Sequence, residues 1–188
     1  MLKNDRWIHY MSLRHNMISP FAEKQVGEGK ISYGVSSFGY DARAGYKWKI
    51  FTDILGLTVD PKKQDHGIFH EIVADESIIL PPNSYALTHT IEEFIIPDNV
   101  SCICVGKSTY ARCGIHVNVT PLEAGWRGQV TVEISNATRL PVKVYPGEGI
   151  MQVLFFEGER PDVSYADRNG KYQDQKGITL AAILPPKN

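Results

Sequence analysis

Short β-rich runs separated by turn residues fill most of the chain after residue 46, and they restrict the fold more than any other property of the sequence. Val, Ile, Phe, Tyr and Thr are common in the runs, while Pro, Gly, Asn and Asp occupy the segments between them, as at 81–83, 97–99 and 146–149. Many short strands at this spacing are typical of an all-β jelly roll or β-barrel, which is the fold class we predict. The predicted strands are residues 47–55, 70–80, 84–90, 100–105, 114–120, 129–135, 141–145 and 150–156.

One short helix is predicted ahead of the strands, within an N-terminal segment of about residues 1–20. Apolar residues recur at approximately helical spacing within residues 4–17, with charged residues between them. These apolar residues are Trp7, Ile8, Met11 and Leu13. Neither a linker nor an internal repeat divides the sequence, so we expect residues 1–188 to form a single domain. The polar stretch at about 165–188 is predicted to be a mobile C-terminal arm.

Composition and charge exclude several functional classes. The formal net charge is −1, so no basic field would draw the chain to nucleic acid or to a membrane surface. No apolar run reaches the roughly 18 residues that span a bilayer, and the first residues lack the basic-then-apolar order of a signal peptide. Three cysteines are an odd, low number for a disulfide framework. We therefore expect a cytoplasmic protein.

Residues 106–109 (GKST) look like the end of a phosphate-binding P-loop, but they do not complete that motif. A P-loop also needs Gly five positions before Gly106, where this chain has Ser101. Two interpretations remain. The segment is a turn that ends a strand, or it is an anion cradle in which backbone N–H groups, Lys107 and Arg112 face a phosphate.

Glu133 lies in a strictly alternating run that is predicted to be a strand. Thr131, Glu133 and Ser135 should point to one face, and the apolar residues between them to the other. A carboxylate in the middle of a strand usually lies on a solvated outer face. The functional alternative is a general acid/base whose pKa is tuned by partial burial. The spacing alone leaves both interpretations open.

No pattern of metal ligands is complete in the sequence. Cys102, Cys104, Cys113 and His116 are close together, yet no histidine is followed two residues later by Glu, and no C-x-x-C occurs. Zinc-dependent nucleotide deaminases need both elements. Cys102 and Cys104 lie in an apolar run, where free cysteine acts as a small hydrophobe. We predict that no residue of the chain holds a zinc ion or another metal.

Several blocks of sequence, taken together and in this order, closely resemble the dCTP deaminase family. Each block alone is weak evidence, whereas the ordered set is specific and runs from the first third of the chain nearly to its end. The blocks are SSFGYDAR at 36–43, GKSTYARCG at 106–114, VNVTPLEAGWRG at 117–128, VTVEISN at 130–136, GIMQVLF at 149–155, and the tail from Tyr165 to Gly177.

The resemblance implies a distorted jelly roll of the kind found in trimeric dUTPases. It implies a homotrimer with active sites at the interfaces between subunits. The implied reaction is the hydrolysis of dCTP to dUTP and ammonia, a step toward dUMP and dTTP, with Mg²⁺ bound through the substrate triphosphate. It also implies feedback inhibition by dTTP.

The resemblance also assigns roles to individual residues. Glu133 takes the place of the family's proton shuttle, and Ser108 and Arg112 match the other catalytic positions. Glu123 matches the acidic residue that contacts the deoxyribose. The implied substrate-binding residues are Lys107, Ser108, Thr109, Arg112, Glu123, Thr131, Val132, Glu133, Gln152, Tyr165, Lys171 and Gln175.

Without zinc, the attacking water must be held by neutral groups, and the Ser108 hydroxyl and a backbone carbonyl near Val119 are the candidates. Arg112 would offset charge on the intermediate. Backbone groups of Thr131 and Glu133 would read the base, as the family implies.

Two other kinds of function are compatible with parts of this pattern. A dUTPase, or a bifunctional enzyme that releases dUMP and pyrophosphate, would share the block at 106–109 and an acidic residue near Glu123. The carboxylate at Glu133 favours deamination, and Pro121 favours a monofunctional enzyme because bifunctional relatives tend to carry an aromatic residue there. A non-catalytic nucleotide-binding trimer is disfavoured by the full set of Ser108, Arg112 and Glu133.

Overall fold

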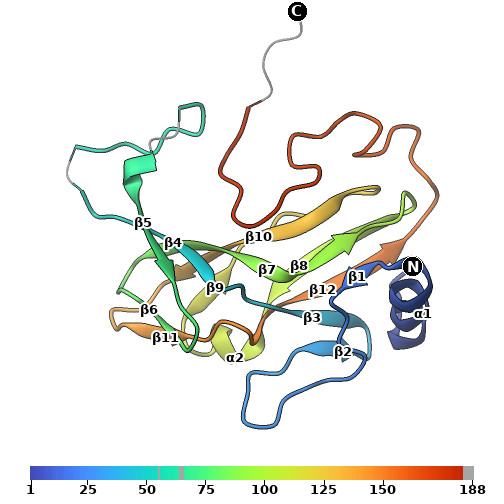
Figure 1. Ribbon diagram of the computed structural model, residues 1–188, viewed down its shortest axis with the longest axis horizontal. Helices are drawn as coiled ribbons and strands as arrows, with labels where there is room; N and C mark the ends of the chain where they lie inside the picture. Colours follow the sequence, from blue (N-terminus) through green and yellow to red (C-terminus); the bar gives the residue numbers. More distant parts are fainter. Residues whose placement is uncertain (55, 64–65, 184–188) are drawn as a thin grey trace, which may run out of the picture.

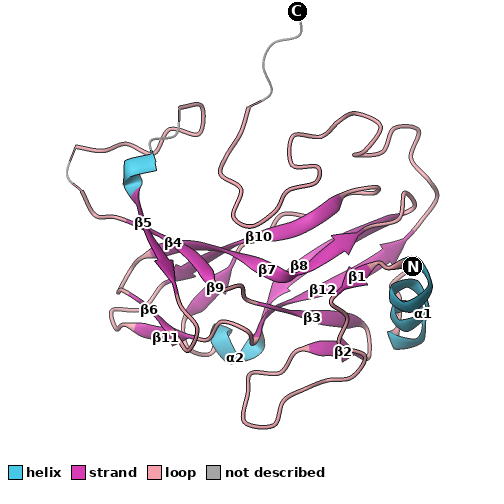
Figure 2. Cartoon of the chain, viewed as in Figure 1, coloured by secondary structure: helices cyan, strands magenta, loops and turns pink. Residues whose placement is uncertain are grey.

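The computed structural model describes residues 1–54, 56–63 and 66–183, and most of its regular secondary structure consists of antiparallel strands (Figures 1 and 2). One sheet has the order β5–β4–β7–β10–β9, with β1 also paired to β7, a second has the order β2–β3–β12–β8, and β11 pairs with β6. The strands are β1 (Ile18–Ser19), β2 (Gly34–Ser36), β3 (Gly39–Arg43), β4 (Lys47–Phe51), β5 (Phe69–Val73), β6 (Ile78–Leu80), β7 (Tyr85–Ile95), β8 (Val100–Gly106), β9 (Ile115–Val117), β10 (Arg127–Asn136), β11 (Val142–Val144) and β12 (Gly149–Glu157). The helical elements are α1 (Asp5–His15), α2 (Ser108–Ala111) and the 3₁₀ turn η1 (His66–Ile68).

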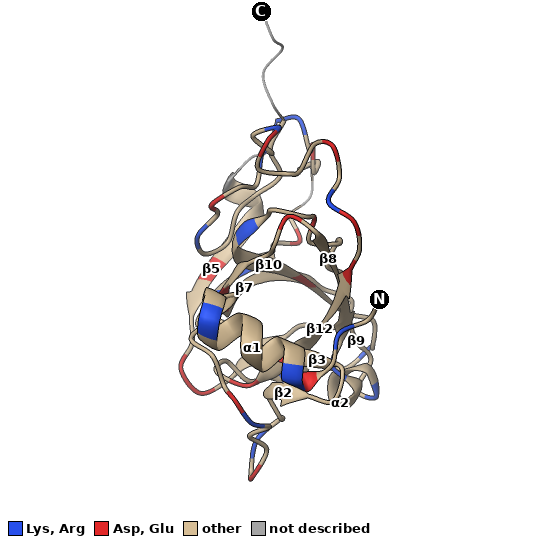
Figure 3. Ribbon diagram, turned by 90° about the vertical axis from the view of Figure 1, so that its right-hand side faces the viewer, with Lys and Arg blue, Asp and Glu red and all other residues tan. Residues whose placement is uncertain are grey.

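The two larger sheets form two layers around one apolar core (Figure 3). Phe94 on β7 and Val132 on β10 face inward from the first sheet, and Tyr40 on β3 and Phe155 on β12 face inward from the second; all four are fully buried. Burying one such side chain contributes about 1.5–3 kcal/mol. The prediction of an all-β, distorted jelly roll is confirmed, although the described strands form separate sheets and no closed barrel.

The predicted N-terminal helix is present as α1. The Asn4 side chain accepts a hydrogen bond from the Trp7 N–H (3.2 Å) and caps its start. Asn16, at φ 54°, ends the helix in the left-handed conformation. Ile8 is buried in the core, but Leu13, predicted to lie on the apolar face, is 58% exposed. That assignment was wrong because Leu13 projects from the side of the helix away from the sheets.

The structure corrects several predicted strands. The run at 47–55 ends as a strand at Phe51, and Leu55 lies outside the described residues. The run at 70–80 is two strands in two different sheets, because a bend around 75–76 breaks it. Strands β1, β2 and β3 were not predicted, since each is short and the first two are only two and three residues long.

The described part of the C-terminal segment, residues 165–183, pairs with the backbone edge of β10 near Gly128 and then contacts outward-facing side chains of that strand; it is called the arm below (Figure 1). The Gln129 N–H donates to the Gln175 carbonyl (3.0 Å), and the Gln175 side-chain amide donates back to the Gln129 carbonyl (2.7 Å). Gly128 has φ 141°, and a Cβ there would lie 2.7 Å from the Gln175 carbonyl oxygen. Only glycine allows the arm to approach this closely. Residues 184–188 of the predicted mobile arm lie outside the described residues, and its mobility stays a prediction.

In the residues that the structure describes, no helix has the length and apolar character needed to cross a membrane.

Candidate functional site

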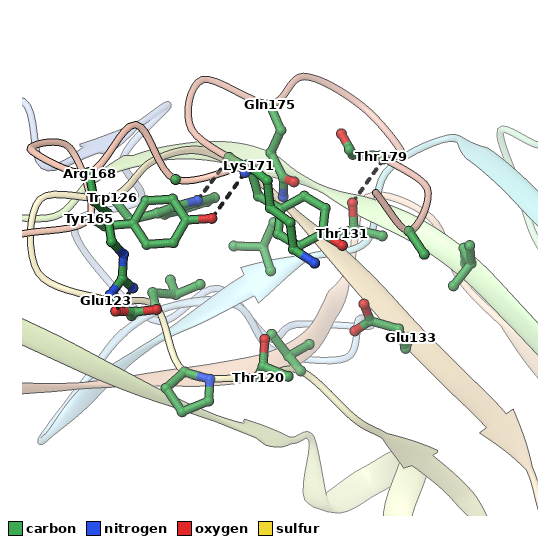
Figure 4. Close-up of a pocket in the computed structure, with 18 of the residues that line it drawn as sticks. Thr120, Glu123, Trp126, Thr131, Glu133, Tyr165, Arg168, Lys171, Gln175 and Thr179 are labelled. Atoms are coloured by element: carbon green, nitrogen blue, oxygen red, sulfur yellow. Dashed lines mark hydrogen bonds and ion pairs between the residues drawn. The ribbon is translucent and has the colours of Figure 1, made fainter. Parts of the chain in front are cut away.

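A pocket of about 620 Å³ lies between β10, the segment at 119–126 and the arm (Figure 4). This volume is within the range of small-molecule sites. We call it the β10 pocket. Its lining residues are Phe51, Leu87, Val119, Thr120, Pro121, Leu122, Glu123, Trp126, Val130, Thr131, Glu133, Tyr165, Arg168, Gly170, Lys171, Tyr172, Gln175, Thr179 and Ala181. It therefore gathers six of the predicted site residues, namely Glu123, Thr131, Glu133, Tyr165, Lys171 and Gln175.

Glu133 lies in this pocket on the polar face of β10, as the alternation of the sequence predicted (Figure 4). Its side chain is half-buried, and Oε2 is buried with no hydrogen-bond partner among the described residues. Burial raises the pKa of Glu133 to about 7, and its own backbone N–H offsets part of that rise. The carboxylate is thus partly shielded from solvent. Its pKa is close to neutral pH, where a general acid/base works best.

The surroundings of Glu133 explain this pKa. Leu87, Val119 and Val130 line the pocket and supply few polar groups. The carboxylate also acts on its neighbours: burial, reinforced by the charge of Glu133, raises the pKa of the Cys104 thiol to about 12. No cation contacts the Glu133 side chain among the described residues, so the loss of hydration is offset only in part, by the backbone N–H of Glu133 itself.

The strand carrying Glu133 has an edge that opens to the pocket. β9 pairs with β10 only at Ile134, Ser135 and Asn136, while β7 pairs along the other edge. Toward the arm, the Thr179 N–H donates to the Thr131 hydroxyl (3.0 Å), which leaves Thr131 only 8% exposed. The polar face of the strand is therefore covered by the arm at Thr131, and it forms the floor of the pocket.

The arm supplies the opposite wall of the pocket. The Trp126 indole N–H donates to the Tyr172 carbonyl (2.9 Å), and the Tyr165 hydroxyl accepts from the Tyr172 N–H (3.0 Å). The Lys171 ammonium donates to the Ala182 carbonyl (2.8 Å). Sequence reasoning did not single out Trp126, although it lies in one of the blocks that carry the family resemblance.

Arg168 is a pocket residue that the sequence analysis missed. It reaches from the arm to Glu123, and the two side chains form an ion pair (Figure 4). The available signal was its place in the polar tail between two predicted site residues, Tyr165 and Lys171.

The other predicted catalytic residues lie elsewhere in the chain. Ser108, Thr109 and Arg112 are exposed and belong to α2 or its C-cap. Figures 1 and 3 place α2 at the end of the molecule away from the arm. The Arg112 guanidinium donates to the Ser108 carbonyl (3.1 Å) of its own helix. One chain therefore does not bring Ser108 and Arg112 to Glu133.

Three further predicted substrate-binding residues make contacts inside the protein. The Lys107 ammonium, 12% exposed, pairs with the buried Asp41 carboxylate at 2.5 Å. The Gln152 side chain donates to the Ser36 hydroxyl (3.0 Å). Val132 is fully buried in the core, so only its backbone could meet a ligand.

Potential metal ligands are dispersed over the part of the chain that the structure describes. Nowhere in it do three His, Cys, Asp or Glu side chains come close enough to hold a metal ion. Cys102, Cys104 and Cys113 are free thiols.

Comparison with known proteins assigns the chain to a family. A family model described as dCTP deaminase-like matches residues 1–158. A dCTP deaminase of Campylobacter concisus (strain 13826) is 60% identical over 184 residues, covering 97% of this chain and 98% of the relative. A dCTP deaminase of Herpetosiphon aurantiacus is 58% identical over 183 residues, covering 97% of this chain and 99% of the relative.

A solved structure shares the fold at much lower sequence identity. The crystal structure of 2′-deoxycytidine 5′-triphosphate deaminase from Agrobacterium tumefaciens superposes with a TM-score of 0.65 at 20% identity, covering 84% of this chain and 48% of that chain. The pocket of this chain holds a half-buried carboxylate, a family model matches most of the sequence, and close relatives cover nearly all of it. The chain therefore belongs to the dCTP deaminase family.

Proposed function

We propose that the chain hydrolyses dCTP to dUTP and ammonia, with Glu133 as the proton shuttle. The observation that carries the proposal is the Glu133 carboxylate in a pocket of about 620 Å³. Its pKa is about 7, and its buried Oε2 has no hydrogen-bond partner in the part of the chain that the structure describes. The relatives that cover the chain almost completely are named dCTP deaminases. A function in the supply of dUMP and dTTP precursors, in the cytoplasm, follows from the same family membership.

The proton balance of the reaction needs one group that accepts and returns a proton twice. Water attacks C4 of cytosine while Glu133 takes its first proton and delivers it to N3. Glu133 then takes the second proton from the new hydroxyl group and delivers it to the amino group, which leaves as ammonia. The water oxygen becomes O4 of uracil. A carboxylate with a pKa near 7 can do both, because neither of its protonation states is strongly favoured at neutral pH.

We propose that a second copy of the chain completes the site. Glu133 lines the pocket and Ser108 and Arg112 do not, yet the resemblance assigns all three to catalysis. A homotrimer with shared sites reconciles these facts. In it, the Ser108 hydroxyl and a carbonyl near Val119 hold the water, and Arg112 offsets negative charge on the intermediate.

We propose that the residues that bind the substrate also come from both copies of the chain. Glu123 receives the deoxyribose, and backbone groups of β10 at Thr131, Val132 and Glu133 read the base. The residues proposed for the triphosphate and for closure over it are Lys107, Thr109, Gln152, Tyr165, Lys171 and Gln175. Mg²⁺ comes with the triphosphate and neutralises part of its charge, and we propose no zinc in the chemistry. Feedback inhibition by dTTP, which shares the deoxyribose and triphosphate, belongs to the same proposal.

Product analysis tests the reaction. The protein is incubated with dCTP and Mg²⁺, and the nucleotide and ammonia are quantified. We expect equal amounts of dUTP and ammonia. Pyrophosphate together with dUMP would instead identify a bifunctional enzyme, and pyrophosphate from dUTP without ammonia from dCTP would identify a dUTPase.

Mixing two inactive variants tests the shared site. Glu133→Gln and Arg112→Ala chains are unfolded together, refolded and assayed. If the two residues of one site come from different chains, mixed trimers contain some intact sites and regain part of the activity. No recovery in trimers shown to be mixed would contradict the sharing.

A further inference from the structure

Arg168 and Glu123 form a contact inside the β10 pocket that neither the family resemblance nor the proposed mechanism uses. Arg168 Nη2 contacts Glu123 Oε2, and the two side chains are 48% and 49% exposed. The guanidinium carbon of Arg168 also lies 5.1 Å from the centre of the Tyr165 ring. Figure 4 shows Arg168 extending from the arm, beside Tyr165, to Glu123.

Several hydrogen bonds hold the turn that carries Arg168. The Ser164 N–H donates to the Asp167 carboxylate (2.9 Å), and the Asp167 N–H donates back to the Ser164 hydroxyl (3.2 Å). The Gly170 N–H closes the turn on the Tyr165 carbonyl (3.1 Å). These reciprocal bonds fix the backbone from which the Arg168 side chain departs.

The same turn is attached directly beside Glu123. The Tyr165 N–H donates to the carbonyl of Ala124, the next residue in the chain after Glu123 (2.9 Å). Gly125 follows, and a Cβ there would lie 3.1 Å from the Ser164 hydroxyl oxygen, so the two segments are tightly packed. Arg168 therefore approaches Glu123 from a position that the backbone sets.

We propose that Arg168 is a positioning residue that orients the Glu123 carboxylate toward the sugar hydroxyl of the substrate. This rests on the proposed function, in which Glu123 receives the deoxyribose. Arg168 engages Oε2, and Oε1 accepts no hydrogen bond from the described residues, so it can accept one from a hydroxyl group of a ligand. The only free hydroxyl on the sugar of dCTP is at the 3′ position. Without the guanidinium, a half-exposed glutamate samples several rotamers, and ordering it for the sugar weakens binding.

The contact also links recognition of the sugar to the arm. Glu123 lies in the segment at 119–126, whereas Arg168, Lys171 and Gln175 all belong to the arm. A nucleotide whose 3′-hydroxyl engages Glu123 therefore favours the same placement of the arm that brings Lys171 to the pocket. This makes Arg168 a determinant of specificity, acting through Glu123.

The test compares dCTP with 2′,3′-dideoxy-CTP, which lacks the 3′-hydroxyl. We expect Arg168→Gln to raise KM for dCTP about fivefold, the size of the net contribution of one ordinary hydrogen bond, with kcat changed by less than about twofold. kcat/KM for the dideoxynucleotide should change by less than about twofold. In a Glu123→Gln background, Arg168→Gln should have no further effect on the ratio of kcat/KM for the two nucleotides.

Arg160→Gln is the matched control. Arg160 binds Asp98 and Asp167 near the start of the arm, and it does not line the pocket. It should leave the ratio of kcat/KM for the two nucleotides unchanged, even if it lowers thermal stability.

Three results would overturn the inference. An equal loss for both nucleotides would mean that Arg168 acts on the triphosphate or on the arm as a whole. No loss of kcat/KM for dCTP would mean that the contact between Arg168 and Glu123 does not contribute to substrate binding. If Glu123→Gln itself fails to discriminate between the two nucleotides, the proposed sugar contact of Glu123 is wrong, and the inference fails with it. The deamination of dCTP, measured separately by its products, would stand.

Discussion

Glu92 is fully buried and Glu133 is half-buried, and the contacts of their carboxylates with the rest of the molecule differ sharply. Glu92 on β7 is fully buried and joins the two larger sheets. Its Oε1 accepts from Arg43 Nε (2.7 Å) and the Tyr40 hydroxyl (3.2 Å), and its Oε2 accepts from the Arg43 N–H (2.9 Å). Glu133, one strand away on β10, has a buried Oε2 with no partner among the described residues.

The comparison shows that burial alone does not make a carboxylate functional. Burial is the largest cause of a raised pKa for both Glu92 and Glu133. The Arg43 guanidinium and backbone oppose that rise at Glu92 without cancelling it, so its charge is compensated in part and both of its oxygens are occupied. At Glu133 the rise is left nearly uncompensated, and an oxygen is free for a proton. An uncompensated buried carboxylate in a cavity is a candidate for proton transfer, and a compensated one holds the fold together.

The largest contrast is expected in catalysis. Glu133→Gln should lower the single-turnover rate of dCTP deamination by about 10²–10⁴ or more, because one group serves both proton transfers. The affinity for dCTP should change by less than about tenfold, since Gln is nearly isosteric with Glu. Rapid-quench turnover and equilibrium binding measure the two quantities.

Glu92→Gln serves as the counterpart in the same assay. It should retain the rate per folded protein, because Glu92 lies in the core and not in the β10 pocket. A loss of less than about tenfold in the Glu133 variant would be smaller than the loss expected on removal of a general base. In that case the distinction between the two glutamates fails.

For stability, the larger effect is expected at Glu92. Glu92→Gln should lower the free energy of unfolding by about 3 kcal/mol, because it leaves the largely buried Arg43 without a counter-charge. Asp98→Asn, which breaks an exposed pair with Arg160, should cost about 0–1 kcal/mol. Chemical denaturation compares the variants. Equal losses for Glu92 and Asp98 would show that the buried pair contributes no more than a surface pair.

A smaller effect is expected in the dependence of stability on pH. The pKa of Glu133 is about 7 in the folded protein, against an ordinary value of 4.5, so the folded state binds this proton more tightly. The stability that the protonated form provides is complete below the ordinary pKa and is lost as pH rises through 7. Glu133→Gln has no such loss. It should therefore be more stable than wild type at pH 8, by about 1–3 kcal/mol.

Unfolding curves at two pH values check this sign. The advantage of the Gln variant should be present at pH 8 and small at pH 4.5, where the native carboxyl is protonated as well. A Gln variant that is less stable than wild type at pH 8 would show that Glu133 is a compensated structural carboxylate like Glu92.

Local patterns in the sequence predicted much of this arrangement. Alternation in the run at 129–135 predicted correctly that Glu133 and Thr131 share one face of a strand, and turn residues marked most strand boundaries. Alternation describes only one strand, however. It could not show that the arm reaches that face, since Thr131 and Thr179, which are in contact, are 48 positions apart. Whether that face is open to solvent or covered depends on this distant contact.

Other features could not be predicted for related reasons. The pairing of Lys107 with Asp41 is one example, because Asp41 is 66 positions away and belongs to a strand that the pattern did not predict. Leu13 was assigned to the buried face of a helix because spacing alone does not say how wide that face is. Ser108 and Arg112 need a second chain in the proposed trimer, and a periodicity within one chain carries no information on it.

The pH dependence of kcat/KM for dCTP tests the role of Glu133 most directly, because it reports the base of the free enzyme. We predict a fall of about tenfold per pH unit below a pKa of about 7 and a plateau above it, in wild type and in Glu92→Gln alike. The terminal phosphate of dCTP titrates in the same range, and measuring dCTP affinity of Glu133→Gln against pH separates that contribution. A profile that is flat across neutral pH after this correction, or the same break in the residual activity of Glu133→Gln, would contradict the account.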